Sequence, residues 1–546
     1  MLKLIIIFFI TPLLAFGQPA MNKYFVQFTD KNGTEFSVNN PSAFLSPRAI
    51  ARRTRQNISI VPQDLPVNTN YINTIVSKGA SILTRSKWFN GIIIECDSVV
   101  LSSVLSLPFV LSVKTVYIQT FSSHFKELQV DHSINVNSQL RINSFDYGNS
   151  FDQIHQINGE FLHEQGYTGD GMLIALLDAG FYSVDQLPVF ENLRNQNNII
   201  ATWDFVSGNS SVYEDDSHGM SVLSTIAGNI PGQIVGTAIN ASFLLLRTED
   251  FFSENIIEEY NWEAAAEYAD SAGADVISSS LGYTEFDDSL SNHKYSDMDG
   301  NHCPSSIAAD IAVSKGILVL TSAGNSGNDS WHFISAPSDG DSVICVGAVY
   351  SNGSHVSFSS WGPSSDGDVK PNLVCKGVNC IISDEGGGIN TGSGTSFACP
   401  ILAGAATCLW QEFPLLNVME IKNAIERSAN YFLSPNATLG YGIPDFRLAS
   451  YILSTGFLPS KDDVIGVYPN PFSENLNVSF FSTTSQTIKL EIINSVGQIM
   501  SSKIESASAM SVNTYTILSD QNLINGFYFI RVSTVDGSIV RKVVKY

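Results

Sequence analysis

The sequence predicts a three-layer α/β domain built on a parallel sheet, preceded by a small α+β domain and followed by a β-sandwich. Four nearly continuous apolar runs, "MLIALL", "ASFLLLR", "ADVISSS" and "GILVLTS", are typical of parallel strands buried on both faces. Helical segments such as "NWEAAAEYADSAG" and "CPSSIAADIAVSKG" alternate with these runs, which favours a three-layer α/β arrangement. Residues 464–546 instead show alternating strands separated by Gly, Asn and Asp turns, as in a sandwich.

The N-terminal residues 1–17 are predicted to be a secretory signal peptide. Lys3 precedes an apolar run over residues 4–16, and the small residues Ala15 and Gly17 are spaced like a cleavage site. A membrane anchor is the alternative, but the run is short and a proline interrupts it. We therefore expect an exported protein with no stable membrane span in its mature form.

The region between the signal peptide and the α/β domain divides into a domain and a linker. Residues 22–118 are predicted to form the α+β domain, with strands at "KYFVQFT" and "WFNGIIIECDS" and a helix, turn and strand in "VVLSSVLSLPFVLSVKTVYI". Residues 119–152 are rich in Ser and Asn, as expected for an exposed, cleavable linker. The α/β domain is then expected over residues 153–455.

Three short motifs supply the carboxylate, the imidazole and the hydroxyl that together make a serine side chain a nucleophile. Asp178 lies in "IALLDAGF", His218 in "DSHGMSVLSTIAG" and Ser396 in "GTSFACPILAG". A serine needs a base to take its proton during attack, and a carboxylate orients that base. The chain order Asp, His, Ser differs from the orders of α/β-hydrolases and of chymotrypsin, and it fits only the subtilisin order.

These motifs, with "VISSSLG" and "LVLTSAGNSG", closely resemble the subtilase family of serine endopeptidases over about residues 155–455. The resemblance implies a subtilisin-like parallel sheet, a catalytic Asp178–His218–Ser396 set and an acyl-enzyme mechanism. It implies that Asn325 donates to the oxyanion. It also implies two substrate-binding segments, which are Ser280, Leu281 and Gly282, and Ser322, Ala323 and Gly324. No cofactor is required for this chemistry, and no residue is assigned as a metal ligand for it.

A structural calcium ion is left open by the loop "YTEFDDSLSNHKYSDMDGNHC". Asp297, Asp299 and Asn301 offer oxygen ligands around a turn at Gly300, but the full ligand set of a calcium loop is absent, which favours a solvated loop.

The sequence does not decide whether any of the seven cysteines form disulfide bonds. A bond within "CKGVNC" is allowed in an exported protein, but spacing does not establish it.

The two flanking domains carry resemblances of their own. Residues 22–118 resemble the subtilase propeptide, an inhibitory folding aid, although "LSPRAIARRTRQ" is a longer insertion than its simplest form carries. An ordinary accessory domain is the alternative. Residues 464–546 resemble the sorting domain of type IX secretion cargo through "YPNPF", "NSVGQ", "NGFYFIRV" and "RKVVKY". That resemblance implies the type IX machinery as a partner, and secretion to the surface or medium of a Gram-negative bacterium through the periplasm. A carbohydrate-binding sandwich is the alternative.

The charge balance excludes one class of partner. Acidic residues outnumber basic ones 52 to 29, giving a net charge of −23 without a basic stripe, so nucleic acid is not an expected partner. Proteins and peptides are the expected substrates. A catalytically inactive surface binding protein, an esterase and a sugar-binding adhesin remain the rival functions.

Overall fold

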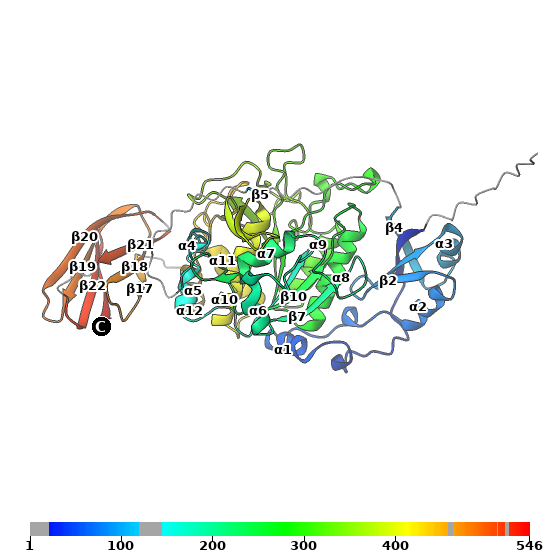
Figure 1. Ribbon diagram of the computed structural model, residues 1–546, viewed down its shortest axis with the longest axis horizontal. Helices are drawn as coiled ribbons and strands as arrows, with labels where there is room; N and C mark the ends of the chain where they lie inside the picture. Colours follow the sequence, from blue (N-terminus) through cyan, green and yellow to red (C-terminus); the bar gives the residue numbers. More distant parts are fainter. Residues whose placement is uncertain (1–20, 119–129, 132–144, 457–461, 510, 519–522) are drawn as a thin grey trace, which may run out of the picture. The chain divides into compact units, whose positions relative to one another are not determined.

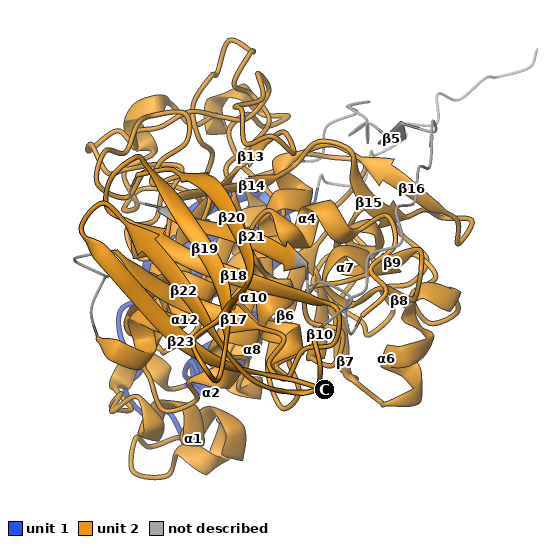
Figure 2. Ribbon diagram, turned by 90° about the vertical axis from the view of Figure 1, so that its left-hand side faces the viewer, with its two compact units in different colours: residues 1–35, 66–121 blue, residues 36–65, 122–546 orange. Residues whose placement is uncertain are grey.

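The computed structural model describes residues 21–118, 130–131, 145–456, 462–509, 511–518 and 523–546. The expected signal peptide and most of the expected linker lie outside these residues. The chain forms two compact units, residues 1–35 with 66–121, and residues 36–65 with 122–546 (Figure 2). The expected domain at 22–118 is therefore divided between the two units.

The first unit is an antiparallel sheet with two helices. Its strand order is β2-β3-β1-β4. The strands and helices are β1 (Asn22–Phe28), α2 (Thr69–Val76), β2 (Ser81–Ser86), β3 (Gly91–Cys96), α3 (Ser98–Leu105) and β4 (Val110–Tyr117). Asp97 begins α3 by accepting hydrogen bonds from the backbone N–H groups of Val99 and Val100. Buried aliphatic and aromatic side chains, most of them on β1, β3, α2 and α3, form the core.

Residues 36–65 leave this sheet and join the second unit. They form η1 (Pro41–Ala43), α1 (Pro47–Arg55) and η2 (Pro62–Asp64). Ser46 caps α1 by accepting from the Ala49 N–H at 3.1 Å, and Pro47 occupies the first helical position.

The second unit is built on a seven-stranded parallel sheet in the order β14-β13-β12-β11-β6-β10-β7. The strands are β6 (Leu173–Asp178), β7 (Ile199–Asp204), β10 (Ser242–Arg247), β11 (Val276–Ser279), β12 (Leu318–Ser322), β13 (Ile344–Val349) and β14 (Leu373–Lys376). Strands β6, β11, β12 and β13 are buried along their whole length, as parallel strands covered on both faces should be. This confirms the predicted three-layer α/β fold.

Helices cover the sheet. The α-helices are α4 (Phe151–His155), α5 (Glu160–Glu164), α6 (Glu191–Asn195), α7 (His218–Ala227), α8 (Ile257–Ala272), α9 (Pro304–Ser314), α10 (Thr395–Glu412), α11 (Val418–Arg427) and α12 (Phe446–Thr455). Helix α10 packs on α7 and on β11 to β14, whereas α8 and α9 lie side by side (Figure 1). Close packing around α10 depends on Gly404, because a Cβ there would lie 2.0 Å from Thr237 Oγ1.

Short elements complete the domain. They are η3 (Pro188–Phe190), η4 (Ser289–Ser291), η5 (Tyr295–Asp297), the β8 (Asn229–Ile230) and β9 (Ile234–Val235) pair, and the β15 (Cys380–Ser383) and β16 (Ile389–Gly392) hairpin that β5 (Val130–Asp131) extends. None of the helices in the part of the chain described here combines the length and the apolar character needed to cross a membrane.

The C-terminal region is the expected sandwich of antiparallel strands. One sheet has the order β17-β18-β21 and the other β20-β19-β22-β23. The strands are β17 (Asp463–Tyr468), β18 (Asn475–Ser482), β19 (Gln486–Asn494), β20 (Ile499–Ala507), β21 (Ser511–Leu518), β22 (Gly526–Thr534) and β23 (Gly537–Lys545). Arg447 of α12 donates to Ser479 Oγ and Tyr468 Oη of this sandwich, and Leu448 and Ile452 share an apolar cluster with Phe481.

Candidate active site

Asp178 and His218 form a hydrogen-bonded pair between the last residue of β6 and the first residue of α7. The distance from His218 Nδ1 to Asp178 Oδ1 is 2.6 Å, and the Ala179 N–H donates to the same oxygen at 2.8 Å. Asp178 is fully buried, whereas the His218 side chain is 17% exposed. Burial raises the pKa of Asp178, and the facing imidazole opposes that rise. The pair thus joins a carboxylate held in the core to an imidazole that solvent can reach.

Gly219 allows helix α7 to approach the end of β6 this closely. A Cβ at position 219 would lie 2.4 Å from the Gly180 carbonyl oxygen and 2.8 Å from Asp178 Cβ. A side chain there would therefore push His218 away from its carboxylate. The "SHG" motif therefore requires glycine at its third position for a steric reason, which the motif alone does not reveal.

Ser396 lies in the first turn of α10. Its Oγ is 3.5 Å from the Ser280 carbonyl oxygen, and Ser280 Oγ donates to the Ser396 carbonyl oxygen at 2.8 Å. The ring of the next residue, Phe397, is 6.3 Å from the His218 ring. Cys399 is buried beneath this turn, with its Sγ 3.7 Å from the Ser279 carbonyl oxygen. The structure thus brings the start of α10 to His218 and to the end of β11.

Asn325 presents its amide next to the backbone N–H of Ser396. Asn325 Oδ1 accepts from Thr395 N and from Thr395 Oγ1, both at 2.9 Å. A Cβ added to Gly394 would lie 3.5 Å from Asn325 Nδ2 and 3.6 Å from Ser396 N. Two N–H donors therefore border one small space that glycine leaves open. Thr395 was not among the predicted site residues, and its position before the serine is the signal that could have found it.

The two predicted substrate-binding segments follow neighbouring strands. Ser280, Leu281 and Gly282 continue β11, and Ser322, Ala323 and Gly324 end or follow β12. They lie close together, because Ser322 Oγ is 3.5 Å from the Leu281 carbonyl oxygen. Gly282 is exposed and Leu281 half-buried. The segments flank the same edge of the sheet from which Asp178 and Asn325 project.

The loop considered for calcium uses its acidic groups in local hydrogen bonds. Asp297 accepts from Lys294 N at 2.9 Å, and Asp299 accepts from Asn301 N at 2.9 Å and from His302. A second set of ligand-type groups joins Glu259 of α8 to His293 and Cys303 of this loop, with ligand atoms within 4.8 Å of one another. Hydrogen bonds account for that set, since Glu259 accepts from His293 Nε2, Ser305 N and Ser305 Oγ.

All seven cysteines are buried free thiols, including Cys375 and Cys380. Burial raises the pKa of Cys399 and of Cys380 to about 12, which keeps both thiols protonated and poorly nucleophilic. A serine nucleophile is therefore favoured over a cysteine one at this site.

Comparison with known proteins assigns a family to the α/β domain, to the N-terminal α+β region and to the C-terminal sandwich. Family models match residues 169–443 as the subtilase family, residues 23–131 as the Peptidase S8 propeptide domain of Bacteroidota, and residues 466–546 as a secretion system C-terminal sorting domain. The chain is 30% identical to Subtilisin E of Bacillus subtilis (strain 168) over 330 residues, covering 60% of this chain and 77% of that protein.

Other relatives agree with this assignment. Subtilisin of Bacillus pumilus is 29% identical over 301 residues, covering 54% of this chain and 97% of that protein. Alkaline protease of Alkalihalobacillus alcalophilus is 28% identical over 284 residues, covering 52% of this chain and 65% of that protein. The chain belongs to the subtilase family of serine peptidases, and it carries an S8 propeptide domain and a C-terminal sorting domain for secretion.

Proposed function

We propose that this chain is a secreted serine endopeptidase that hydrolyses peptide bonds through an acyl-enzyme formed on Ser396. The observation that carries the proposal is the 2.6 Å hydrogen bond from His218 to buried Asp178, beside the helix turn that holds Ser396. With Nδ1 donating to Asp178, Nε2 is the nitrogen that takes the serine proton during attack. The carboxylate fixes the tautomer and stabilises the imidazolium that forms.

The oxyanion of the tetrahedral intermediate would be bound in the space beside Gly394. Asn325 Nδ2 and Ser396 N border that space, and Thr395 holds the Asn325 side chain by its Oδ1. Donors fixed before the reaction stabilise developing charge without reorganisation. The protonated His218 then gives its proton to the leaving amine, and water releases the acyl group by the same steps.

The substrate would bind in an extended conformation between the two segments at the sheet edge. Residues 280–282 follow β11, so their backbone can pair with a peptide laid beside them. Residues 322–324 end or follow the adjacent β12, and they would line the other side of the peptide, because the Ala323 N–H and carbonyl already bond to Val346 and Ser335. Glycine is needed at position 282 because a Cβ there would lie 2.3 Å from Ser335 Oγ. The scissile carbonyl would then lie over Ser396.

A serine-directed phosphonate distinguishes this proposal from its rivals. We expect the mature enzyme to be labelled at Ser396 and to degrade unfolded protein, and an inactive surface binding protein would do neither. An esterase would react with the phosphonate and cleave esters but leave unfolded protein intact. A sugar-binding adhesin would retain glycans after loss of Ser396.

Maturation and export follow from the two flanking domains. We propose that residues 22–118 inhibit the enzyme until the chain is cut in the linker at 119–152, and that residues 464–546 direct transport from the periplasm across the outer membrane of a Gram-negative bacterium by the type IX machinery. N-terminal sequencing of the secreted catalytic chain should start between residues 119 and 155. A start at Gln18 would refute the propeptide role.

None of the proposed steps needs a cofactor. A solvated loop stays the favoured interpretation for residues Asp297, Asp299 and Asn301, since both carboxylates already accept local hydrogen bonds, and structural calcium is the alternative. Dialysis against EDTA tests it, because a calcium-dependent fold would lose thermal stability and recover it when calcium is returned.

A further inference from the structure

A basic helix from the propeptide region is part of the folded peptidase. Helix α1 and its flanks, residues 36–65, group with the catalytic unit rather than with the propeptide sheet (Figure 2). The stretch "SPRAIARRTRQ" that contains α1 has four arginines and no acidic residue, in a chain of net charge −23. Two of these arginines, Arg52 and Arg53, are only 1% exposed. A guanidinium is rarely buried so fully unless it is paired.

The buried arginines bind the C-terminal end of helix α8. Arg52 lies 2.5 Å from Asp270 Oδ1 and Arg53 lies 2.8 Å from Asp270 Oδ2, and the Asp270 side chain has no exposed surface. Arg52 also donates to the carbonyl oxygens of Ala274 and Lys315. The carbonyls that end a helix have no partner within it and carry partial negative charge, so cations are favoured there.

Neutral hydrogen bonds extend the contact to three helices. Ser46 donates through N and Oγ to the carbonyl oxygens of Ser271 and Ala272, each at 2.9 Å. Gln56 donates to the Gly316 carbonyl oxygen after α9 and accepts from Val418 N at the start of α11. Such a set of backbone partners specifies one register for the helix rather than a loose electrostatic attraction.

Gly273 makes the close approach of α1 sterically feasible. Its φ is +94°, and a Cβ there would lie 2.7 Å from Ala49 N and 2.8 Å from Arg48 Cβ. Glycine at the end of α8 therefore serves two purposes: it adopts the positive φ that the turn requires, and it leaves space for α1 to pack against the turn.

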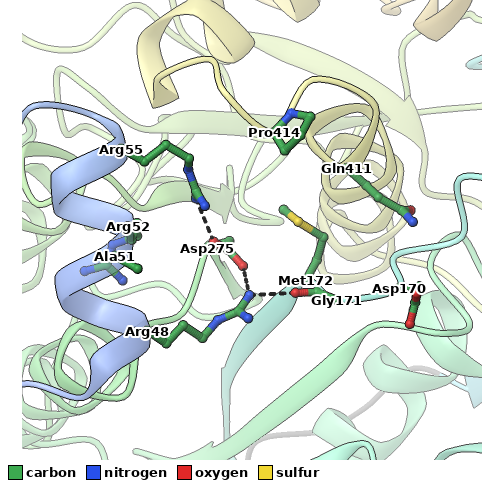
Figure 3. Close-up of a pocket in the computed structure, with 10 residues that line it drawn as sticks. All are labelled: Arg48, Ala51, Arg52, Arg55, Asp170, Gly171, Met172, Asp275, Gln411 and Pro414. Carbon is green, nitrogen blue, oxygen red and sulfur yellow. Dashed lines mark hydrogen bonds and ion pairs between the residues drawn. The ribbon is translucent and has the colours of Figure 1, made fainter.

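The contact is made at the opposite edge of the sheet from the catalytic groups. Asp275 immediately precedes β11, and Arg48 and Arg55 both reach it from α1 (Figure 3). Asp178, in contrast, ends β6, and Asn325 follows β12. A cavity of about 320 Å³ beside Asp275 leaves Arg48 and Arg55 partly exposed. Occupation of this edge by α1 therefore does not block a substrate at the other.

We propose that the surface around Asp270 and Asp275 is a binding site for residues 41–58 of this same chain, and that this segment stays bound after the propeptide link is cut. The segment is thus a retained structural part of the mature peptidase, distinct from the inhibitory sheet of the propeptide. The inference rests on the proposed function only for how the link is cut in nature.

The test separates retention from catalysis by using the Ser396→Ala precursor with a site-specific protease sequence inserted between residues 119 and 129, so that β5 stays with the peptidase. After cleavage, gel filtration in native buffer should elute the N-terminal fragment together with the peptidase. Removing one side of a buried ion pair costs enough to weaken binding by roughly 100-fold or more. Arg52→Ala with Arg53→Ala, or Asp270→Asn, should therefore release the fragment.

Matched variants keep the result interpretable. Arg85→Ala removes an exposed arginine from the propeptide sheet and should not change retention. Arg53→Lys and the half-exposed Arg48→Ala are milder changes that should give intermediate release if the double variant fails to fold. Equal retention in all the variants of α1 would overturn the proposal.

A second measurement uses the wild-type enzyme after its own maturation. Mass spectrometry of natively purified enzyme should find one peptide spanning Ser46 to Gln56 for each catalytic chain. Active mature enzyme without that peptide would overturn the proposal while leaving the serine mechanism standing. An inactive enzyme that retains the peptide would refute the mechanism and leave the inference intact.

Discussion

The carboxamide oxygen of Asn325 accepts hydrogen bonds from both the backbone N–H and the hydroxyl of Thr395. This relationship ties the orientation of the Asn325 amide to the residue directly before Ser396. Any shift of the first turn of α10 would move both the nucleophile and the proposed oxyanion donor. The position of the nucleophile and the orientation of the proposed oxyanion donor therefore both depend on Thr395.

Asn325→Leu is expected to lower kcat by about 100- to 1000-fold while leaving KM nearly unchanged. That range was measured for the corresponding donor of a subtilisin, and the amide is assigned to charge that exists only in the transition state. Steady-state kinetics with a peptide substrate checks it. A change confined to KM would refute the assignment.

Thr395→Val should lower kcat by about 2- to 10-fold, because it removes one of the two hydrogen bonds that hold Asn325 and keeps the backbone one. Thr395→Ser is the matched control, since it retains the hydroxyl and should keep near-normal turnover. Normal turnover in Thr395→Val, or a larger loss in Thr395→Ser than in Thr395→Val, would contradict this role of the hydroxyl.

Ser396→Ala is expected to abolish proteolysis and phosphonate labelling in a protein that still folds. Ser393→Ala is the control, because that side chain accepts from Asn379 N in the neighbouring turn. Unprocessed precursor should accumulate in the first variant and not in the second, if propeptide removal is autocatalytic. Normal turnover without the Ser396 hydroxyl would end the proposed mechanism.

Glu164 makes stability fall as pH rises. Burial, followed by repulsion from Glu160, raises the pKa of Glu164 from 4.5 to about 7. The folded chain then holds this proton more tightly than the unfolded chain. The contribution of Glu164 to the free energy of unfolding is therefore complete below pH 4.5 and is lost as the pH rises through about 7.

Glu164→Gln should therefore stabilise the protein at pH 8 by about 1 kcal/mol, a value reduced because the carboxyl is partly exposed. It should have little effect at pH 4. Thermal unfolding in the Ser396→Ala background avoids self-digestion, and Glu191→Gln on an exposed residue is the control. An equal gain at both pH values would contradict the assignment.

A chain ending at Asp463 should keep proteolytic activity and lose export. The sandwich holds none of the proposed catalytic residues, but its removal exposes Leu448 and Ile452 and frees Arg447 from Ser479. We therefore expect a lower unfolding temperature together with near-normal turnover. Cell fractionation should find the shortened precursor in the periplasm. Normal export, or tight polysaccharide binding by the isolated sandwich, would contradict the sorting role.

The sequence predicted the parts of this molecule that depend on local pattern. The apolar runs before Asp178 and Asn325 are parallel strands, because burial on both faces leaves a continuous apolar signal. The order of the motifs indicated which groups would meet, and the structure places His218 against Asp178.

Contacts between residues distant in sequence left no such signal. The arginines of α1 pair with Asp270 more than 200 residues later, and nothing in "LSPRAIARRTRQ" shows that its charges are buried. Arginine normally indicates a solvated surface, so burial by a specific partner cannot be deduced from composition. The hydrogen bonds from Thr395 to Asn325 likewise join the start of α10 to the loop after β12, which only the completed sheet brings together.

The burial of Asp270 against Arg52 and Arg53 has a practical consequence for recombinant production. Expression of the catalytic region alone, starting after residue 120, would omit both guanidinium groups and leave the ends of α8 and α9 exposed. Such a chain should collect in inclusion bodies. Supplying residues 21–118 as a separate polypeptide in the same cell should restore soluble protease.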